Sequence, residues 1–266
     1  MNHSFEINTE FLSKFKATEE AVIGIGSTAK VVLATSVDEP DVKFAVKKFT
    51  LYKVNAAGKR VSEDSIVARN FYKEVEIMKR LKNPSVIQLV ATVTTHKYLA
   101  IVMPYCRKGA LSVLLPSLTD VQQTRFSIQL TEAVKYLHTK NVIHGDIKPP
   151  NVLVDGHDHA LLADFGLSRV VPNKMVELVV DYGTRSFRAP ETFRQLRVNP
   201  FKADVYSLGV TLWSIALKKT AFFWIDYKEE ITKATLVPIR LRKVVLLLLQ
   251  EDPNKRPSAT DILLDL

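Results

Sequence analysis

Short runs of β-branched, aromatic and aliphatic residues fill much of the first hundred positions. Two such runs flank glycines within residues 21–34, and three more occupy 44–49, 86–93 and 98–103. Runs of this length and composition are typical of β-strands. Together they predict a five-stranded antiparallel sheet, preceded by a polar lead-in over residues 1–18 that packs against it.

A different period dominates the rest of the chain. Apolar residues recur at three- and four-residue steps over 62–82 and again over 119–138, where Thr119 and Gln122 form a capping-box start. A third apolar helix is expected to open at 204–209, and residues 244–249 have the pattern of a buried helix segment. Two short runs, 152–154 and 160–165, predict a hairpin between the helices. The second part of the chain is therefore predicted to be mostly helical.

Length and composition fit a globular protein with a large core. The chain has 266 residues, of which 47% are hydrophobic and 24% charged. Its net charge of +9 is spread along the chain: residues 1–105 hold 15 basic and 11 acidic residues, and the remainder holds 22 and 17. No basic block resembles a nucleic-acid tail, so we expect no nucleic-acid partner.

Cys106 is the only cysteine, so no intrachain disulfide can form and a reducing compartment is favoured. The amino terminus lacks the apolar core of a signal peptide. The longest apolar run, 244–249, is far too short to cross a bilayer. We therefore expect a cytoplasmic protein with no membrane partner, and the nucleus is the alternative location. An oligomeric state is not indicated.

The glycine-containing turn within 21–34 suggests a phosphate-binding loop. Gly24, Gly26 and Ala29 give the pattern G-x-G-x-x-A, which leaves backbone free to approach phosphate oxygens. A dinucleotide-binding turn has the same pattern, but a helix follows it. Here the sequence Lys-Val-Val-Leu-Ala indicates a strand. The spacing therefore favours a hairpin folded over a nucleotide.

The strongest chemical signal is the stretch His-Gly-Asp-Ile-Lys-Pro-Pro-Asn at 144–151, followed by Ala-Asp-Phe-Gly at 163–166. A carboxylate (Asp146), an ammonium (Lys148) and a carboxamide (Asn151) suit phosphoryl transfer, which needs a proton acceptor, positive charge and oxygen ligands for Mg²⁺. Asp164 supplies a second metal ligand. A polar turn between a helix and a strand also produces such a string, so the rest of the chain decides between the two.

This stretch resembles the catalytic loop of eukaryotic-type protein kinases, H-R-D-L-x-x-x-N followed by D-F-G, except that Gly145 stands where the pattern has Arg. The other family motifs follow in the family order over about residues 21–261. They are Phe-Ala-Val-Lys around Lys47, a helix carrying Glu74, Gly-Thr to Ala-Pro-Glu at 183–191, Asp204 and Arg256. The chain is most similar to the serine/threonine type, because Lys148 and Thr184 match that pattern.

The resemblance implies an α+β, bilobal fold with a small amino-terminal lobe, a sheet plus one main helix, and a larger helical lobe. Residues 1–266 are then one protein kinase domain, with lobes at 1–103 and 110–266 and a hinge at 104–109. It also implies that Asp204 holds the catalytic loop by its backbone and that Glu191 pairs with Arg256. His144 is interpreted as a packed structural histidine.

The resemblance further implies ATP and a protein substrate as partners, with ATP between the lobes. Asp146, Lys148, Lys47 and Glu74 are the expected catalytic residues, Lys47 being paired with Glu74. Asn151 and Asp164 are expected to hold Mg²⁺, with Mn²⁺ as the alternative metal. The residues expected to contact nucleotide are Ile23, Gly24, Gly26, Ala29, Val31, Ala45, Lys47, Met103, Pro104, Cys106 and Leu153.

Gly145 has a regulatory implication. The arginine that it replaces receives an activation-segment phosphate in many kinases, and residues 169–181 contain no Ser, Thr or Tyr. We therefore predict activity that does not require phosphorylation of that segment. Two alternatives stay open: a pseudokinase that acts as a scaffold or allosteric partner, and a kinase for small molecules.

Overall fold

The computed structural model of the chain describes residues 15–26, 29–36, 39–54, 60–63, 65–95 and 98–262. The chain divides into two compact units. The first comprises Met1–Arg80 and Ile87–Cys106, and the second comprises Leu81–Val86 and Arg107–Leu266. Of the predicted lead-in over residues 1–18, positions 15–18 belong instead to the first strand, and the rest lies outside the described residues.

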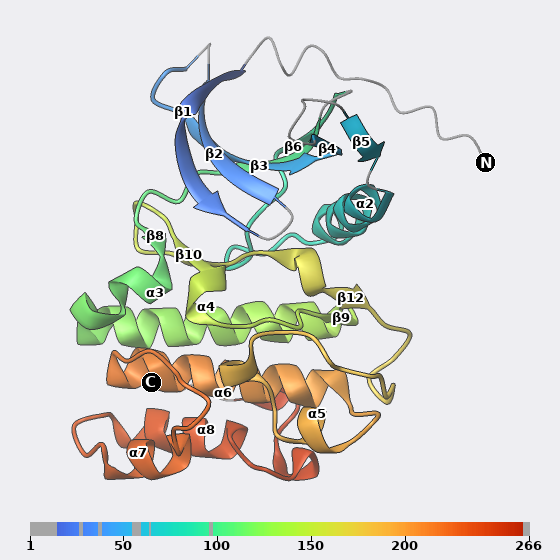
Figure 1. Ribbon diagram of the computed structural model, residues 1–266. Helices are drawn as coiled ribbons and strands as arrows, with labels where there is room; N and C mark the ends of the chain where they lie inside the picture. The colour runs from blue at the N-terminus through green and yellow to red at the C-terminus, as the bar shows by residue number, and fades with distance from the viewer. Residues whose placement is uncertain are drawn as a thin grey trace. The chain divides into compact units, whose positions relative to one another are not determined.

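The first unit contains the predicted five-stranded antiparallel sheet, seen in blue and green in Figure 1. Its order is β1-β2-β3-β7-β6, and every neighbouring pair is antiparallel. The strands span Phe15–Ile25 (β1), Ala29–Ser36 (β2), Lys43–Thr50 (β3), Tyr98–Pro104 (β7) and Ala91–Thr94 (β6). The β1–β2, β2–β3 and β6–β7 pairs join sequence neighbours, so local patterns predict them, whereas the β3–β7 pair joins strands more than forty residues apart.

The two faces of this sheet have different roles. Val32, Val46 and Val102 belong to a buried apolar cluster on one face. Side chains alternate along a strand, so Lys47 projects from the opposite face. Helix α2 (Ser65–Lys79) contacts β3 and β7, and the Phe49 and Phe71 rings meet edge to face at 5.5 Å. The main helix therefore packs on the face that carries Lys47.

Two predicted boundaries in this region are wrong. The helix expected over 62–82 is shorter, because Arg60–Glu63 form β5 and pair with β4 (Tyr52–Val54). The strand expected over 86–93 is reduced to Ala91–Thr94. Its first residue, Val86, instead makes a parallel bridge to Leu162 within the second unit. Long-range partners override the local strand pattern there.

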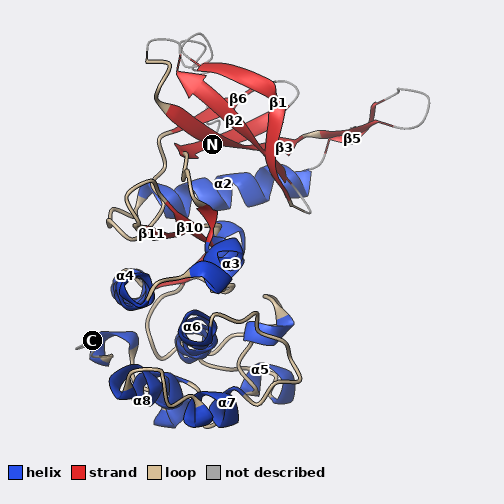
Figure 2. Ribbon diagram, turned by 90° about the vertical axis from the view of Figure 1, so that its left-hand side faces the viewer, coloured by secondary structure: helices blue, strands red, loops and turns tan. Residues whose placement is uncertain are grey.

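Helices make up most of the second unit. Figure 2 views α4 (Asp120–Thr139) and α6 (Pro200–Leu217) nearly end-on, with α7 (Tyr227–Lys233) and α8 (Ile239–Leu248) on the far side of α6 from α4. Short helices α3 (Leu111–Leu114) and α5 (Glu191–Arg194) complete the set among the described residues. Helix α6 contacts both α4 and α8, and Leu212 and Trp213 within it are fully buried. The core of this unit therefore surrounds α6.

The helix boundaries follow from capping chemistry. Thr119 and Gln122 form the predicted capping box at the start of α4. Helix α6 begins at Pro200, four residues before the predicted position, because Asn199 accepts from two amide groups and Pro200 suits the first helical position. The apolar run at 244–249 lies largely in α8, as predicted. No helix among the described residues is long and apolar enough to cross a membrane.

Small sheets hold the loops that carry the polar motifs. Strands β10 (Val152–Val154) and β11 (Ala160–Leu162) form the predicted hairpin, and β8 (Gly109–Ala110) pairs with β10. Strand β9 (Val142–Ile143) pairs with β12 (Arg169–Val170). The segment 144–151 thus leaves β9 and enters β10, which fixes both of its ends.

Candidate active site

A buried aspartate on α6 holds the loop formed by residues 144–151. The carboxylate of Asp204, which is 2% exposed, accepts the backbone N–H groups of His144 at 2.7 Å and Gly145 at 2.9 Å. It also lies 3.1 Å from the ring nitrogen Nε2 of His138. The prediction that Asp204 fixes the loop through its backbone is confirmed. These three polar partners offset the free-energy cost of burying the carboxylate.

Four donors surround the carboxylate of Asp146. Its Oδ1 accepts the backbone N–H and the hydroxyl of Thr184, each at 2.8 Å. Its Oδ2 lies 2.7 Å from Nζ of Lys148 and 3.0 Å from Nδ2 of Asn151. Lys148 also donates to Thr184 Oγ1 at 2.6 Å. The structure therefore brings together Asp146, Lys148, Asn151 and Thr184, all of which the sequence singled out.

These contacts set the charge of Asp146. Burial by itself raises the pKa of this carboxyl, but the hydrogen bond and positive charge of Lys148, together with the two bonds from Thr184, outweigh it. The net pKa lies below the ordinary value of 3.8. At neutral pH the group is a carboxylate aligned by fixed donors, as a residue that receives a proton late in a reaction should be.

Oxygen ligands for a metal are available beside this carboxylate. Nδ2 of Asn151 donates to the backbone oxygen and to Oδ2 of Asp146, so the amide orientation directs its Oδ1 elsewhere. The backbone N–H of Ala163 donates to the carbonyl of Asn151 at 2.8 Å, which places the next residue, Asp164, at the same end of the hairpin. Asp164 is exposed. A carboxylate and an amide oxygen fit Mg²⁺, which takes few protein ligands and completes its shell with phosphate and water.

The backbone of Asp164 is in an uncommon conformation. Its φ of 62° and ψ of 78° lie in the left-handed region, which Gly adopts readily and Asp or Asn adopt less often. Backbone strain of this kind persists only where the surrounding structure enforces it, and it is concentrated at functional sites. Here the buried Phe165 packs edge to face on His144 at 5.2 Å. His144 also contacts the Ala163 carbonyl through Nε2, so it is a packed structural residue, as predicted.

The first unit holds the expected Lys47–Glu74 ion pair. Nζ of Lys47 lies 2.8 Å and 3.0 Å from the two carboxylate oxygens of Glu74. The Glu74 side chain is 3% exposed and that of Lys47 is 15% exposed. The ammonium of Lys47 is thus held by Glu74 of α2, while part of the Lys47 side chain remains exposed. Glu76 instead makes exposed contacts with Lys79 and Arg80.

Several expected nucleotide contacts share the sheet face of Lys47. Val31 pairs with Lys47 and Ala45 with Met103 in the strand register, and Gly24 lies opposite Val31. The remaining predicted positions in this unit are Ile23, which is exposed, Gly26 and Ala29 at the β1–β2 turn, Pro104 at the end of β7, and buried Cys106. Leu153 is half-buried on β10 of the second unit.

The scaffold pair between Glu191 and Arg256 is confirmed. The guanidinium meets the carboxylate in a fork at 2.6 Å and 2.7 Å, and both side chains are almost completely buried. Arg256 also donates to the carbonyls of Gln250, Lys202 and Glu251. All these bonds tie α5, α6 and the segment after α8 together, and none reaches Asp146.

The packing of one group of residues around Gly145 was not predicted from the sequence. The Tyr182 ring lies over the backbone of Gly145, where an added Cβ would come within 2.8 Å of the ring, and Arg169 stacks on the same ring at 4.4 Å. Gly183, with φ of 90°, packs against the Gly145 carbonyl. Arg169, Tyr182 and Gly183 lie 24 to 38 positions after Gly145, so no local pattern could have joined them to it. The only signal was the missing arginine itself.

Taken together, the second unit presents an aligned carboxylate, an ammonium and two metal-type oxygens, and the first presents a held ammonium on a sheet face. These are the groups that phosphoryl transfer requires. The polar-turn explanation of residues 144–151 does not account for four donors converging on one carboxylate.

Comparison with known proteins agrees with this chemistry. Residues 17–265 match the family model described as protein kinase domain. The chain is 30% identical over 250 residues to the serine/threonine-protein kinase GRIK1 of Arabidopsis thaliana, a match covering 89% of this chain and 62% of that protein. It is 31% identical to the serine/threonine-protein kinase CTR1 of the same plant over 211 residues, covering 73% and 26%. It is also 28% identical to the probable serine/threonine-protein kinase MARK-A of Dictyostelium discoideum, covering 91% and 23%.

The chain spans at most about three fifths of the length of these three relatives, since the covered shares are 62%, 26% and 23%. The likeness therefore concerns one part of each relative. Because the family model accounts for all but the first 16 residues and the last one, and the five-stranded sheet and helical second unit are those expected of it, this chain belongs to the protein kinase domain family.

Proposed function

We propose that residues 1–266 act as a serine/threonine protein kinase domain that transfers the γ-phosphoryl group of ATP to a hydroxyl of a protein substrate. The observation that carries the proposal is the Asp146 carboxylate, which is held by Thr184, Lys148 and Asn151. A mere structural turn has no need of an ionised, partly buried carboxylate with a lowered pKa. The buried free thiol of Cys106 suits a reducing compartment, the cytoplasm or the nucleus.

Each residue has a distinct role in this proposal. Lys47, aimed by Glu74, neutralises the α- and β-phosphates, and the sheet face around Val31, Ala45 and Met103 packs on the nucleotide base. Asn151 and Asp164 hold Mg²⁺, or Mn²⁺ in its place. When bound, the metal neutralises phosphate charge and orients the γ-phosphoryl group. Positioning and electrostatics then supply most of the rate enhancement.

The contacts of Asp146 suggest an order of events. A carboxylate offers about four acceptor sites, and Asp146 already receives four donors. A substrate hydroxyl can therefore bond to it only after one donor leaves. Lys148 is the donor with an alternative partner, because the γ-phosphoryl oxygens attract its ammonium. We propose that Lys148 turns to the phosphate and thereby frees Oδ2 of Asp146 for the hydroxyl.

Activity without activation-segment phosphorylation is the second part of the proposal. Val171 and Val180 are buried, and Leu178 exchanges two backbone hydrogen bonds of 2.9 Å with Val198. Asn199 donates to the carbonyl of Lys174 at 2.9 Å. The hydroxyl oxygen of Tyr182 is buried, so it offers no accessible acceptor for a kinase. Apolar packing thus supports the segment in the place where phosphate–arginine bonds support it in other kinases.

The direct test is phosphorylation of a degenerate Ser/Thr peptide library by the chain with Mg·ATP. The control is Asp146→Asn, which keeps the size of the side chain and removes its charge. We expect incorporation of phosphate by the wild type and a loss of at least about a hundredfold in the variant, the usual effect of removing a general base. Equal incorporation by both proteins would refute the role of Asp146, and none by the wild type would favour the pseudokinase alternative.

A further inference from the structure

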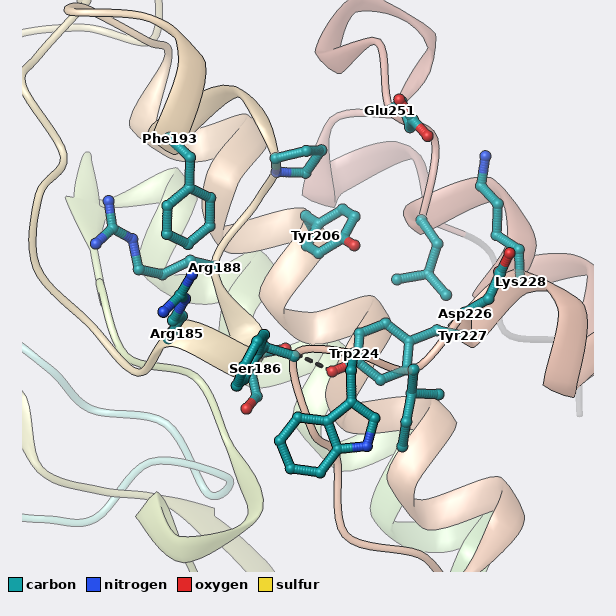
Figure 3. Close-up of a pocket in the computed structure, with 14 residues that line it drawn as sticks. Arg185, Ser186, Arg188, Phe193, Tyr206, Trp224, Asp226, Tyr227, Lys228 and Glu251 are labelled. Atoms are coloured by element: carbon teal, nitrogen blue, oxygen red, sulfur yellow. Dashed lines mark hydrogen bonds between the residues drawn. The ribbon is translucent and has the colours of Figure 1, made fainter.

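A cavity of about 520 Å³ lies beside the segment that follows Thr184. Its walls come from η4 (Arg185–Phe187), α5, α6 and the start of α7, and Figure 3 shows Phe193 and Trp224 on different sides of it. The hydrogen bond from the Tyr227 hydroxyl to the carbonyl of Ser186, at 2.9 Å, ties two of these walls together. The cavity is therefore built by packed elements on several sides.

Large aromatic side chains line this cavity and face solvent. Phe193 is 52% exposed, Phe223 is 57% exposed and Trp224 is 69% exposed. The Phe223 and Trp224 rings meet edge to face at 4.9 Å. Isolated exposed apolar residues are ordinary, but three exposed aromatic rings around one hollow form the kind of patch that binds another chain.

Positively charged side chains outnumber carboxylates around the cavity. Arg185, Arg188 and Lys228 line it, and among the described residues none of the three forms an ion pair with a carboxylate. Arg188 is occupied by the carbonyls of Val180 and Thr192. The two lining carboxylates are also engaged, since Asp226 caps α7 and Glu251 lies 3.5 Å from Arg194.

Arg185 is the cation best placed to meet a ligand. It is exposed, and its guanidinium lies 4.5 Å from the centre of the Phe223 ring, which leaves its planar edge free for a carboxylate. Arg185 directly follows Thr184, whose hydroxyl is 2.8 Å from Asp146. Consecutive Cα atoms are about 3.8 Å apart, and an extended chain advances about 3.3 Å per residue. A peptide with its hydroxyl at Asp146 thus has neighbouring residues within reach of Arg185.

We propose that this cavity is a docking site for an extended segment of the protein substrate itself, with an acidic residue next to the phosphorylated Ser or Thr and an aromatic side chain a few residues away. The acidic side chain contacts Arg185, and the aromatic side chain enters the hollow between Phe193 and Trp224. This inference rests on the proposed kinase activity and adds the class of substrate sequence that the chain selects.

The test uses peptides with one Ser, scanned with Glu or Lys beside it and with Phe or Ala three to five residues away. We expect the wild type to favour Glu over Lys by roughly fivefold in kcat/KM, the size of one exposed charge pair. Arg185→Glu should reverse that order. A reversal cannot arise from misfolding, and an unchanged preference for Glu would overturn the role of Arg185.

The aromatic half of the site is tested by Trp224→Ala. We expect KM for the Phe peptide to rise roughly tenfold and KM for the Ala peptide to stay the same, because only the former loses a buried contact. Leu236→Ala is the matched control, since Leu236 is fully exposed and lies outside the cavity. Equal effects of Trp224→Ala on both peptides would overturn the proposal.

Binding of the labelled Glu–Phe peptide, followed by fluorescence anisotropy, separates this proposal from the kinase activity. If the wild type transfers phosphate without the Arg185 and Trp224 dependence, the docking site is refuted and the kinase activity stands. If no phosphate is transferred but Arg185→Glu and Trp224→Ala weaken peptide binding while Leu236→Ala does not, the docking site stands and the kinase activity is refuted.

Discussion

Gly145 shows how one residue can reshape its surroundings. Its φ of 81° lies in the left-handed region, and a Cβ there would meet the Tyr182 ring at 2.8 Å and the Leu167 carbonyl at 3.2 Å. Glycine is the residue that accepts this conformation without steric cost. The Tyr182 ring therefore occupies the space that a side chain at position 145 would need.

Gly145→Ala should destabilise the chain because it combines a left-handed non-glycine residue with a steric clash. We expect a loss of at least about 1 to 2 kcal/mol in the free energy of unfolding, measured by urea denaturation. Gly156→Ala is the control, since Gly156 has no atom within 4 Å of an added Cβ. Equal stability of the two variants would contradict the packing of Tyr182 on Gly145.

Lys148→Met should raise the pKa of Asp146. Burial raises this pKa, and Lys148 is the largest of the groups that lower it. In the wild type the pKa is lowered, so the stabilisation from the charged carboxylate is present above the unfolded pKa and is lost as pH falls through the folded one. The variant should therefore lose its carboxylate at a higher pH.

The side-chain carboxyl resonance of Asp146, followed by ¹³C NMR against pH, measures this directly. Lys243→Met, at an exposed lysine on α8, is the control for the loss of one positive charge. An Asp146 titration that is identical in the wild type and in Lys148→Met would show that Lys148 does not set its charge.

At the scale of elements, the activation segment is supported by packing. Val171 is buried with Ile143 and Phe201, and the Leu178–Val198 bridge holds the middle of the segment. These contacts are apolar or backbone in nature, so phosphate removal leaves them intact. We expect phosphatase treatment to leave the rate of peptide phosphorylation unchanged. A phosphatase-inactivated control must be run in parallel, and silencing only by the active phosphatase would contradict the proposal.

Two ion pairs of the second unit should differ greatly in their contribution to stability. Arg256 and Glu191 are buried, whereas Arg194 and Glu251 are about 70% exposed. Removing one partner of a buried pair leaves an uncompensated charge, which costs about 3 to 5 kcal/mol, and an exposed pair contributes about 0 to 1 kcal/mol.

We therefore expect Arg256→Leu to lower the free energy of unfolding by about 3 to 5 kcal/mol and Arg194→Leu to change it by less than about 1 kcal/mol. Urea denaturation monitored by circular dichroism gives both values. A small loss in Arg256→Leu would contradict this prediction, because Glu191 and the carbonyl groups that accept from Arg256 all lose their donor in that variant.

At the scale of the whole molecule, the proposed chemistry is divided between the two units. Lys47 and Glu74 belong to the first, and Asp146, Asn151 and Asp164 belong to the second. We expect Lys47→Met and Asp164→Asn each to abolish phosphate transfer to peptide while circular dichroism still shows a folded chain with a cooperative thermal transition, because each removes one charge that the triphosphate or its metal needs. Lys30→Met, at an exposed position of β2, is the matched control. Full activity in either test variant would refute the assigned role.

Much of the fold could be predicted because its signals are local. The β1–β2–β3 strands pair with sequence neighbours, and the Thr119 capping box sets the start of α4 within three residues. Errors occurred where pairing with another segment, near or distant, decides the outcome. Val86 looks like a strand residue, yet it bridges to Leu162, and Ser62 looks helical, yet it pairs with Lys53.

The sequence by itself determined the order of the elements, the family and the identity of the polar groups at the candidate site, since periodicity, caps and short motifs depend on adjacent residues. Only the tertiary structure decided how those groups are held. Asp204 reaches the backbone of Gly145 across 59 positions, and Tyr182 covers Gly145 from 37 positions away. The cavity beside Trp224 is likewise made by η4, α5, α6, α7 and the segment that follows α8. Contacts at such separations depend on how packed elements meet in space, which no single stretch of sequence specifies.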